Sequence, residues 1–235
     1  MAEKKSNREM IIENAILLFY ERGFERTTMR LIAEESSITH PAIFNHFKSK
    51  ADIASILIYR FFRGVVRTTE RYIEDKKLSR DDDRTLFFYW TAHFYYCKTD
   101  TNFFRFMNEF SNSYRSDFDS VENDYFTQIF RNLMHWNYNK SDVEYRIYSS
   151  LLNAASNILG HAVSTGEISL AKAVEEISNI VYAIVRLERP ASGGDIENFV
   201  RSLDTGKYLG YSVLEDFLLT DFGELYDEIT TDLFR

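Results

Sequence analysis

The sequence contains few residues that interrupt helices. Its 235 residues include two prolines and nine glycines, whereas a β-sandwich of this length would need many more tight turns. A single cysteine, Cys97, cannot form an intramolecular disulfide, and no arginine-rich signal segment followed by an apolar stretch is recognisable at the start. We therefore expect an all-α protein of the reducing cytoplasm.

Long apolar runs are missing as well. The run from Ile56 to Phe62 is interrupted by Tyr59 and Arg60, and it is far shorter than the roughly 20 residues that span a bilayer. We expect a soluble protein without a membrane partner.

The formal net charge of -8 disfavours a nucleic-acid partner, because neutralising phosphates supplies much of the affinity for DNA. The charge is unevenly distributed, however. Residues 1–50 contain eight Lys or Arg and seven Asp or Glu, so the acidity belongs to the remainder of the chain. The charge of the N-terminal segment therefore permits DNA binding without itself indicating it.

The first 50 residues predict three helices. The first ends at Gly23, while Thr28 and Thr39 are the predicted N-caps of two shorter helices, with Pro41 in the first turn of the third. Apolar residues at helical spacing give the expected buried faces: Ile11, Ile12, Ala15, Ile16, Leu18, Phe19, Leu31, Ile32, Ala33, Ile43, Phe44 and Phe47. Ile38 is expected to fill the turn between the second and third helices.

A capping box of Ser49 and Asp52 predicts the start of a long helix that ends near Glu74. Polar residues 75–84 then predict a loop. Further helices are expected over residues 85–97, 102–115, 121–136, 142–164, 169–188 and 207–220. We expect two domains, a helix-turn-helix domain over residues 1–50 and a larger helical domain over residues 51–235.

The string T-T-M-R-L-I-A-E-E-S-S-I-T-H-P-A-I-F-N-H-F-K-S-K, which begins at Thr27, resembles the DNA-binding signature of the TetR family of bacterial transcriptional regulators. The resemblance covers residues 8–55. It implies a helix-turn-helix over residues 28–47 that binds double-stranded operator DNA as a homodimer. Two residues depart from the family pattern: Ser37 stands where glycine is usual, and Phe44 stands where tyrosine is typical.

The same resemblance assigns DNA contacts. The expected base-reading residues are Thr39, His40, Pro41, Ala42 and Asn45, and Arg30 is expected to reach a guanine. The expected phosphate contacts come from Thr28, Phe44, His46 and Lys50. Lys4, Lys5 and Arg8 would add a basic arm, although a disordered solvated terminus accounts for them equally well.

Aromatic residues are concentrated in one segment of the second domain. The chain has 37 Phe, Tyr and Trp residues, of which 18 fall between residues 87 and 138. The resemblance implies a small-molecule pocket there, so we expect an apolar or aromatic effector that contacts Phe104, Phe110 and Tyr114. The alternative is that these rings only fill a helical core.

The resemblance also implies a dimer interface built from the last two long helices, which points to residues 173–187 and 208–219. The first of these segments has an apolar stripe: Val174, Ile177, Ile180, Val181, Ile184 and Val185. The alternative is a helix buried within one chain.

No pattern predicts an enzyme, a metal site or a cofactor. His93 and Cys97 are one helical turn apart, but no further ligands complete a metal site near them. No glycine-rich phosphate loop is present. We therefore predict a regulator, most simply a repressor that a small molecule releases from a palindromic operator. Two alternatives remain open: an activator, and a helical ligand-binding protein or enzyme that uses the helix-turn-helix only as a structural or interaction element.

Overall fold

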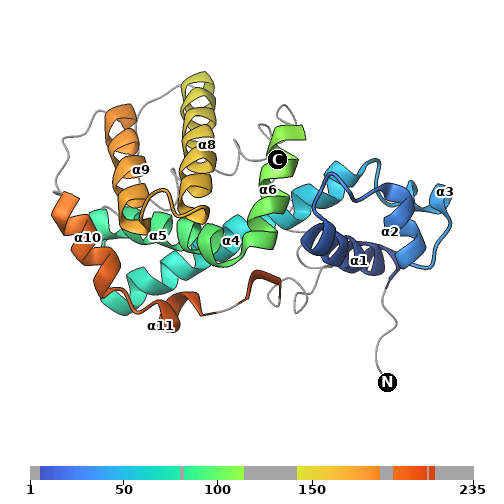
Figure 1. The fold of residues 1–235 in the computed structure, drawn as a ribbon, viewed down its shortest axis with the longest axis horizontal. Helices are drawn as coiled ribbons and strands as arrows, with labels where there is room; N and C mark the ends of the chain where they lie inside the picture. Colours follow the sequence, from blue (N-terminus) through green and yellow to red (C-terminus); the bar gives the residue numbers. More distant parts are fainter. Residues whose placement is uncertain (1–5, 80–81, 114–141, 186–192, 211, 215–235) are drawn as a thin grey trace. The chain divides into compact units, whose positions relative to one another are not determined.

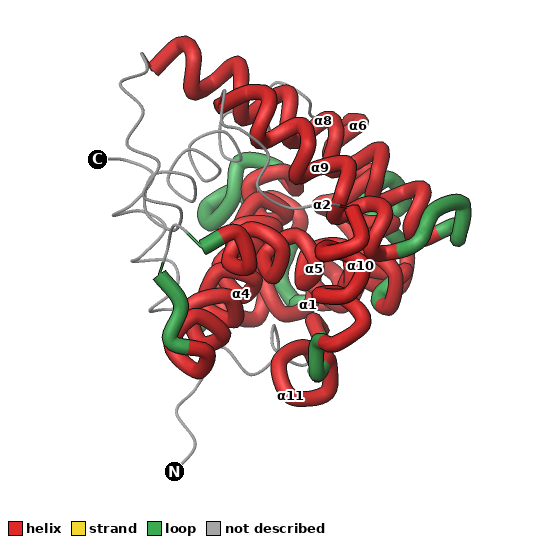
Figure 2. Tube along the Cα trace, turned by 90° about the vertical axis from the view of Figure 1, so that its left-hand side faces the viewer, coloured by secondary structure: helices red, strands yellow, loops and turns green. Residues whose placement is uncertain are grey.

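The structure is a computed structural model, and it describes residues 6–79, 82–113, 142–185, 193–210 and 212–214 (Figure 1). Helices joined by loops make up these residues, and no strand occurs among them (Figure 2). The all-α prediction is confirmed. No helix of the described residues is both long enough and apolar enough to cross a membrane.

Contacts divide the chain into two compact units. Of the described residues, 6–61, 102–113 and 212–214 belong to the first unit, and 62–79, 82–101, 142–185 and 193–210 belong to the second. The first unit contains α1 (Asn7–Arg22), α2 (Met29–Glu35), α3 (His40–Ile43), the start of α4 (Lys50–Lys76), and α6 (Thr101–Ser113). The predicted domain boundary lies after residue 50, at the end of the helix-turn-helix. The first compact unit of the structure extends further, to residue 61 in α4, and also includes α6.

Local signals set the ends of α1 and α2. The Ser6 side chain accepts a hydrogen bond from Glu9 N–H, and the Glu9 carboxylate accepts one from Ser6 N–H, which completes a capping box. Gly23 ends α1 with a φ of 84°, a conformation that favours glycine. The Thr28 hydroxyl accepts a hydrogen bond from Leu31 N–H at 3.2 Å, so the predicted N-cap of α2 is confirmed.

The predicted core of the first three helices is largely confirmed. The residues that the structure buries are Ile11, Ile12, Ala15, Ile16, Leu18, Phe19, Ile32, Ala33, Ile43 and Phe47. Leu31 is half-buried. Phe44 is 47% exposed, so its predicted burial is wrong. The reason is that α3 ends at Ile43, one residue before Phe44, and Ile43 and Phe47 occupy the interior in its place.

The predicted capping box at the start of α4 is confirmed. Ser49 Oγ accepts a hydrogen bond from Asp52 N–H at 3.2 Å, and the Asp52 carboxylate accepts one from Ser49 N–H at 3.1 Å. The helix runs to Lys76, two residues beyond the predicted end.

The second unit is built around α5 (Asp83–Thr99), which packs against α8 (Asp142–Ser164), α9 (Leu170–Val185) and α10 (Gly193–Ser202). Figure 1 shows α8 and α9 side by side, and these two helices are in contact. Twelve of the 17 side chains of α5 are buried, including Trp90 and Phe94. Its burial and its contacts with three other helices make α5 the central helix of this unit.

Some predicted helices differ from the observed ones. The observed bounds of α8 are those predicted, 142–164. The sequence did not predict α10, and it predicted a helix over 207–220 where the structure has the short α11 (Thr205–Leu209). The predicted helix over 121–136, and residues 215–220, lie outside the described residues.

Candidate nucleic-acid interface

The turn between α2 and α3 depends on Ser37. This residue has a φ of 55°, in the left-handed region that glycine adopts most easily. Its N–H donates to Glu34 O at 3.1 Å, and the N–H of Ile38 donates to Ala33 O at 3.0 Å. These bonds satisfy carbonyls at the end of α2. The turn therefore keeps the conformation that glycine usually provides, with serine in its place.

The surface formed by α3 and its flanking residues presents the predicted base-reading side chains. Thr39, His40, Pro41 and Asn45 are exposed, and Ala42 and His46 are half-buried. Thr39 occupies the N-cap position of α3, but its side chain makes no capping hydrogen bond. Ile43 and Phe47 anchor this short segment in the core. The arrangement leaves the first turn of α3 accessible to a DNA groove.

Phe44 lies on the same surface. Its ring is edge-on to the imidazole of His40, with ring centroids 5.2 Å apart. An exposed phenyl ring without a hydroxyl offers only apolar contact to a sugar or phosphate. The predicted backbone contact of Phe44 is thus compatible with its position and stays a prediction.

Two predicted contact residues of α2 already have intramolecular partners. The Arg30 guanidinium donates to the Glu34 carboxylate at 2.9 Å, and both side chains are exposed. The hydrogen bond and charge of Glu34 raise the pKa of Arg30. Thr28 is exposed and caps α2. For Arg30 to contact a guanine, it would have to leave an exposed ion pair, which costs little in water.

Lys50 differs most from its predicted role. Its ammonium donates to Phe24 O at 2.7 Å and to Thr27 O at 2.9 Å, and it lies 4.1 Å from the centroid of the Phe24 ring. Burial lowers the pKa of Lys50, while the charges of Glu109 and Glu25 act in the opposite direction. Lys50 therefore fastens the loop between α1 and α2. Sequence spacing gave no signal of this role, and its predicted phosphate contact stays a prediction.

The predicted effector residues lie in α6 or just beyond it. Phe104 and Phe110 are buried, at 5% and 0% exposure. Phe110 packs edge-on against Phe24, so it contributes to the core of the first unit. Tyr114 lies outside the described residues. A role for these residues in effector binding stays a prediction.

The second unit encloses a buried polar contact of its own. His93 Nε2 lies 2.8 Å from Ser156 Oγ and 3.9 Å from Cys97 Sγ, and all three residues are buried. Among the described residues, no group of three or more His, Cys, Asp or Glu residues could hold a metal ion. Burial raises the pKa of the Cys97 thiol. His93 therefore contacts Ser156 and Cys97 in the interior of this unit.

Comparison with known proteins places the N-terminal helices in a family. Residues 11–57 match the model of the bacterial regulatory proteins of the tetR family. This is a TetR-family helix-turn-helix. The match covers most of α1, all of α2 and α3, and the start of α4, which are the elements that carry the exposed residues described above.

Curated relatives are similar over a short segment of this chain. A segment of 67 residues is 34% identical to "Probable HTH-type transcriptional regulator YttP" of Bacillus subtilis, and it covers 28% of this chain and 32% of that protein. A segment of 56 residues is 43% identical to HTH-type transcriptional regulator TtgR of Pseudomonas putida, and it covers 24% of this chain and 27% of that protein. The matched segment thus spans about a third or less of the length of these relatives.

Likeness of fold extends beyond the helix-turn-helix. The structure of Thermus thermophilus FadR, a TetR-family transcriptional repressor in complex with lauroyl-CoA, has a TM-score of 0.55 and 20% sequence identity. The alignment covers 80% of this chain and 100% of that one. The larger helical part of this chain therefore shares the fold of TetR-type proteins.

Proposed function

We propose that this protein is a transcription regulator that binds a palindromic DNA operator as a homodimer. One observation carries the proposal: within a TetR-family helix-turn-helix, the first turn of α3 is exposed while Ile43 and Phe47 anchor it in the core. Such a helix can enter a major groove with its N-terminal side chains on base edges. Because one short recognition helix reads few base pairs, useful specificity requires a two-fold partner.

Selection of bound sequences from random DNA tests this function. We expect a palindromic site whose affinity falls steeply as salt rises, since phosphate contacts release counterions. In a matched pair, Asn45→Ala should relax the preference at one position in each half-site, whereas Glu13→Ala, on α1, should leave the selected site unchanged. Failure of the wild-type protein to select any site would favour a helical ligand-binding protein or enzyme that uses the helix-turn-helix for structure or interaction.

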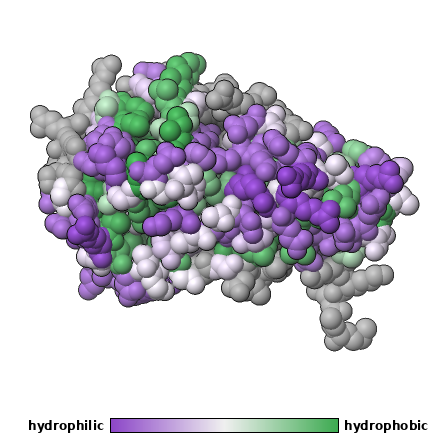
Figure 3. All heavy atoms as spheres, in the orientation of Figure 1, coloured by the Kyte–Doolittle hydropathy of each residue, from purple (hydrophilic) through white to green (hydrophobic). Residues whose placement is uncertain are grey.

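The dimer surface that we propose is an apolar stripe on α8. Val143, Ile147, Leu151 and Ile158 are 52–70% exposed, and their spacing places them along one face of the helix. Figure 3 shows apolar atoms along this exposed helix. Burial of this stripe by a second copy would remove apolar surface from water in a two-fold contact.

The predicted stripe of α9 has a different environment. Val174, Ile177 and Val181 are no more than 1% exposed, because α9 packs against α5, α8 and α10 of its own unit. These three side chains are therefore already buried without a partner chain. The more exposed stripe lies on α8. In the proposed dimer, α8 therefore contacts the second copy, and α9 packs against α8 within its own unit.

We further propose that a small apolar or aromatic molecule binds the second unit and releases the protein from DNA, so that it acts as a repressor. The support is an aromatic interior, formed by Trp90, Phe94 and other rings of α5, that contains the polar pair His93 and Ser156. The T. thermophilus protein of similar fold was solved with lauroyl-CoA, a ligand with an apolar acyl chain. Pockets for such ligands combine apolar walls with a few polar groups.

Titration in both directions tests this effector model. Lauroyl-CoA and a panel of apolar aromatic compounds are the ligands to test, and a true effector should weaken operator binding about 5- to 150-fold. Operator DNA should then weaken the binding of that effector by the same factor, as thermodynamic linkage requires. A reporter assay with the operator in its natural promoter region gives the sign of regulation. Increased expression in the presence of the protein would identify an activator instead.

A further inference from the structure

Within the first unit, α6 contacts the loop that joins α1 to α2. The Glu109 carboxylate accepts a hydrogen bond from Glu25 N–H at 3.0 Å. It also lies against Gly23, where a Cβ atom would collide with the carboxylate. Glycine is favoured at position 23 by its φ of 84°, and the Glu109 carboxylate would have to move to make room for a larger residue there.

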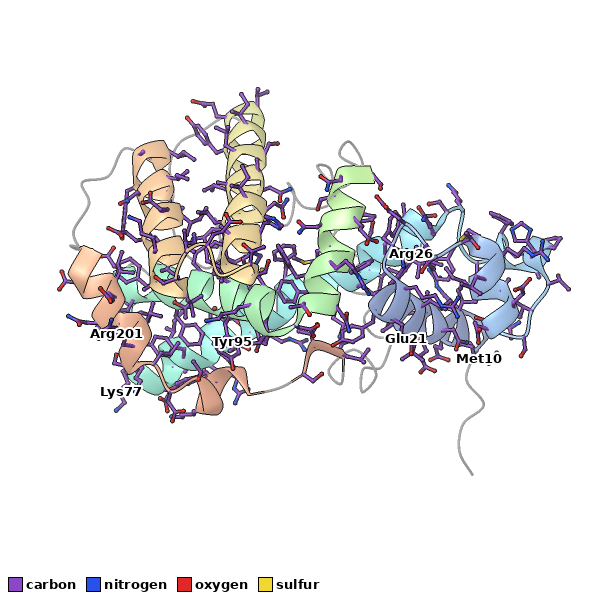
Figure 4. The ribbon with its side chains drawn as sticks, in the orientation of Figure 1. Met10, Glu21, Arg26, Lys77, Tyr95 and Arg201 are labelled. Atoms are coloured by element: carbon purple, nitrogen blue, oxygen red, sulfur yellow. The ribbon has the colours of Figure 1, made fainter. Side chains whose placement is uncertain are left out.

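A second side chain of α6 contacts the end of α1. The Arg105 guanidinium donates to Tyr20 O at 3.0 Å and to Glu21 O at 2.9 Å. These carbonyls belong to the last turn of α1, where a cation is favoured by the helix dipole and by unsatisfied carbonyls. Figure 4 labels Glu21 near the end of α1 and Arg26 in the loop that follows.

Aromatic side chains also hold α6 against α1 and the loop that follows it. Phe106 stacks on Phe19 with centroids 5.1 Å apart, and Phe110 lies edge-on to Phe24 at 5.1 Å. Lys50 also contacts the Phe24 ring and donates to carbonyls of the same loop. The loop over residues 23–28 is therefore fixed by side chains from both α4 and α6.

We propose that Arg105 and Glu109 are positioning residues for DNA binding, a role that rests on the proposed function. The loop they hold leads directly into Thr28, the N-cap of α2, and α2 leads through the Ser37 turn into α3. Both residues lie outside residues 11–57, the segment that matches the family. The orientation of the base-reading surface thus depends on side chains from a distant part of the sequence.

Small displacements are enough to make this role measurable. A binding site keeps its affinity only when its contact groups stay within about 0.5 Å and 10–20° of the productive geometry. A loop released from Arg105 and Glu109 would let α2 and α3 tilt relative to α1 while the aromatic contacts still hold the unit together. Operator affinity would then fall before the unit unfolds.

The experiment compares full-length variants by operator binding, salt dependence and thermal unfolding. Arg105→Ala and Glu109→Ala should weaken operator binding about 3- to 30-fold at temperatures where circular dichroism shows a folded protein. Neither variant should change the selected base sequence or the salt slope, because neither residue contacts DNA. Asn112→Ala is the matched control, since Asn112 is an exposed residue of α6, and it should bind as the wild type does.

Conservative variants separate positioning from general stability. Glu109→Gln keeps an oxygen that can accept from Glu25 N–H, so it should retain most of the operator affinity. Arg105→Lys keeps the charge but not the planar pair of donors, so its affinity should lie between those of the wild type and Arg105→Ala. Should the folded alanine variants bind the operator as tightly as Asn112→Ala does, Arg105 and Glu109 are not positioning residues. An absence of DNA binding by the wild type itself would instead reject the proposed function.

Discussion

The rings of Phe24 and Phe110 pack edge-on with their centroids 5.1 Å apart. One residue follows α1 and the other lies in α6, so a contact between segments 86 positions apart completes the core of the helix-turn-helix unit. Edge-on aromatic pairs add stabilisation beyond the apolar area that they bury. The contact explains why a helix well beyond the helix-turn-helix belongs to the same compact unit.

Replacing Phe110 with Leu tests this packing role. We expect the free energy of unfolding to fall by about 1–3 kcal/mol, because the change removes the ring contact and leaves part of its volume unfilled. Chemical denaturation measures this change, and effector titration should give an unaltered response in the folded variant. An altered response with unchanged stability would instead place Phe110 in the effector site. Phe104→Leu is the companion variant, because Phe104 is buried on the same helix.

Replacing Lys50 with Met distinguishes the two roles considered for this residue. Loss of its hydrogen bonds to Phe24 O and Thr27 O should lower the free energy of unfolding by about 1–3 kcal/mol, as two buried acceptors lose a charged donor. We expect the slope of DNA affinity against salt to stay the same, because the ammonium is engaged within the chain. A slope lowered by about one, together with unchanged stability, would show a phosphate contact instead.

Ser37→Gly should stabilise the protein. Serine at a φ of 55° carries a steric cost that glycine avoids, so we expect a gain of about 1 kcal/mol in the free energy of unfolding. Thermal and urea unfolding measure the change. Glu35→Gly is the control, because Glu35 is an exposed residue of α2 and glycine within a helix should cost about 1 kcal/mol. Equal losses in the two variants would mean that the Ser37 conformation carries no strain.

Local patterns predicted the local structure well. Thr28 and the pair of Ser49 and Asp52 cap helices as predicted, because capping depends on residues three positions apart. Ser37, which stands where the family pattern has glycine, adopts the left-handed conformation that glycine usually provides. The predicted burial of Phe44 was wrong, because the helical spacing of apolar residues continues past Ile43, whereas α3 ends at Ile43.

Contacts between distant segments could not be predicted in the same way. Nothing in the spacing of Lys50 shows that its ammonium binds carbonyls 26 and 23 residues earlier. The same holds for Arg105 and Glu109, which meet α1 and its loop across 84 or 85 residues. Such contacts depend on how helices pack, and a single sequence gives the apolar faces of helices but not their partners.

A charge placed in the α8 stripe should disrupt the proposed dimer. Leu151 is 53% exposed between Ile147 and Ile158 on the same face, so Leu151→Glu would place a carboxylate in an apolar contact between two copies. Sedimentation should show a monomer with much weaker operator binding and an unchanged thermal stability of the monomer. Ser164→Glu, near the end of α8, is the control for added charge. A Leu151→Glu protein that stays dimeric would place the interface elsewhere.

His93 should make the stability of the protein depend on pH in the acid range. Burial lowers the pKa of His93 from 6.5 to about 3, so the native state keeps a neutral imidazole where the unfolded chain takes up a proton. Below pH 6.5 the unfolded state therefore binds more protons, so the contribution of this group to stability falls as the pH falls, until the pH nears 3. Above pH 6.5 the contribution of His93 should not change with pH.

The variant His93→Gln removes this titration while keeping a polar partner for Ser156 Oγ, which lies 2.8 Å from His93 Nε2. Urea unfolding between pH 4 and pH 8 should show a shallower loss of stability below pH 6.5 in the variant than in the wild type, although the variant is less stable at neutral pH. His161→Gln, at an exposed position of α8, is the matched control for loss of a histidine. Parallel curves for the wild type and His93→Gln over this range would show that His93 is protonated as readily in the folded protein as in the unfolded chain, which its burial between α5 and α8 argues against.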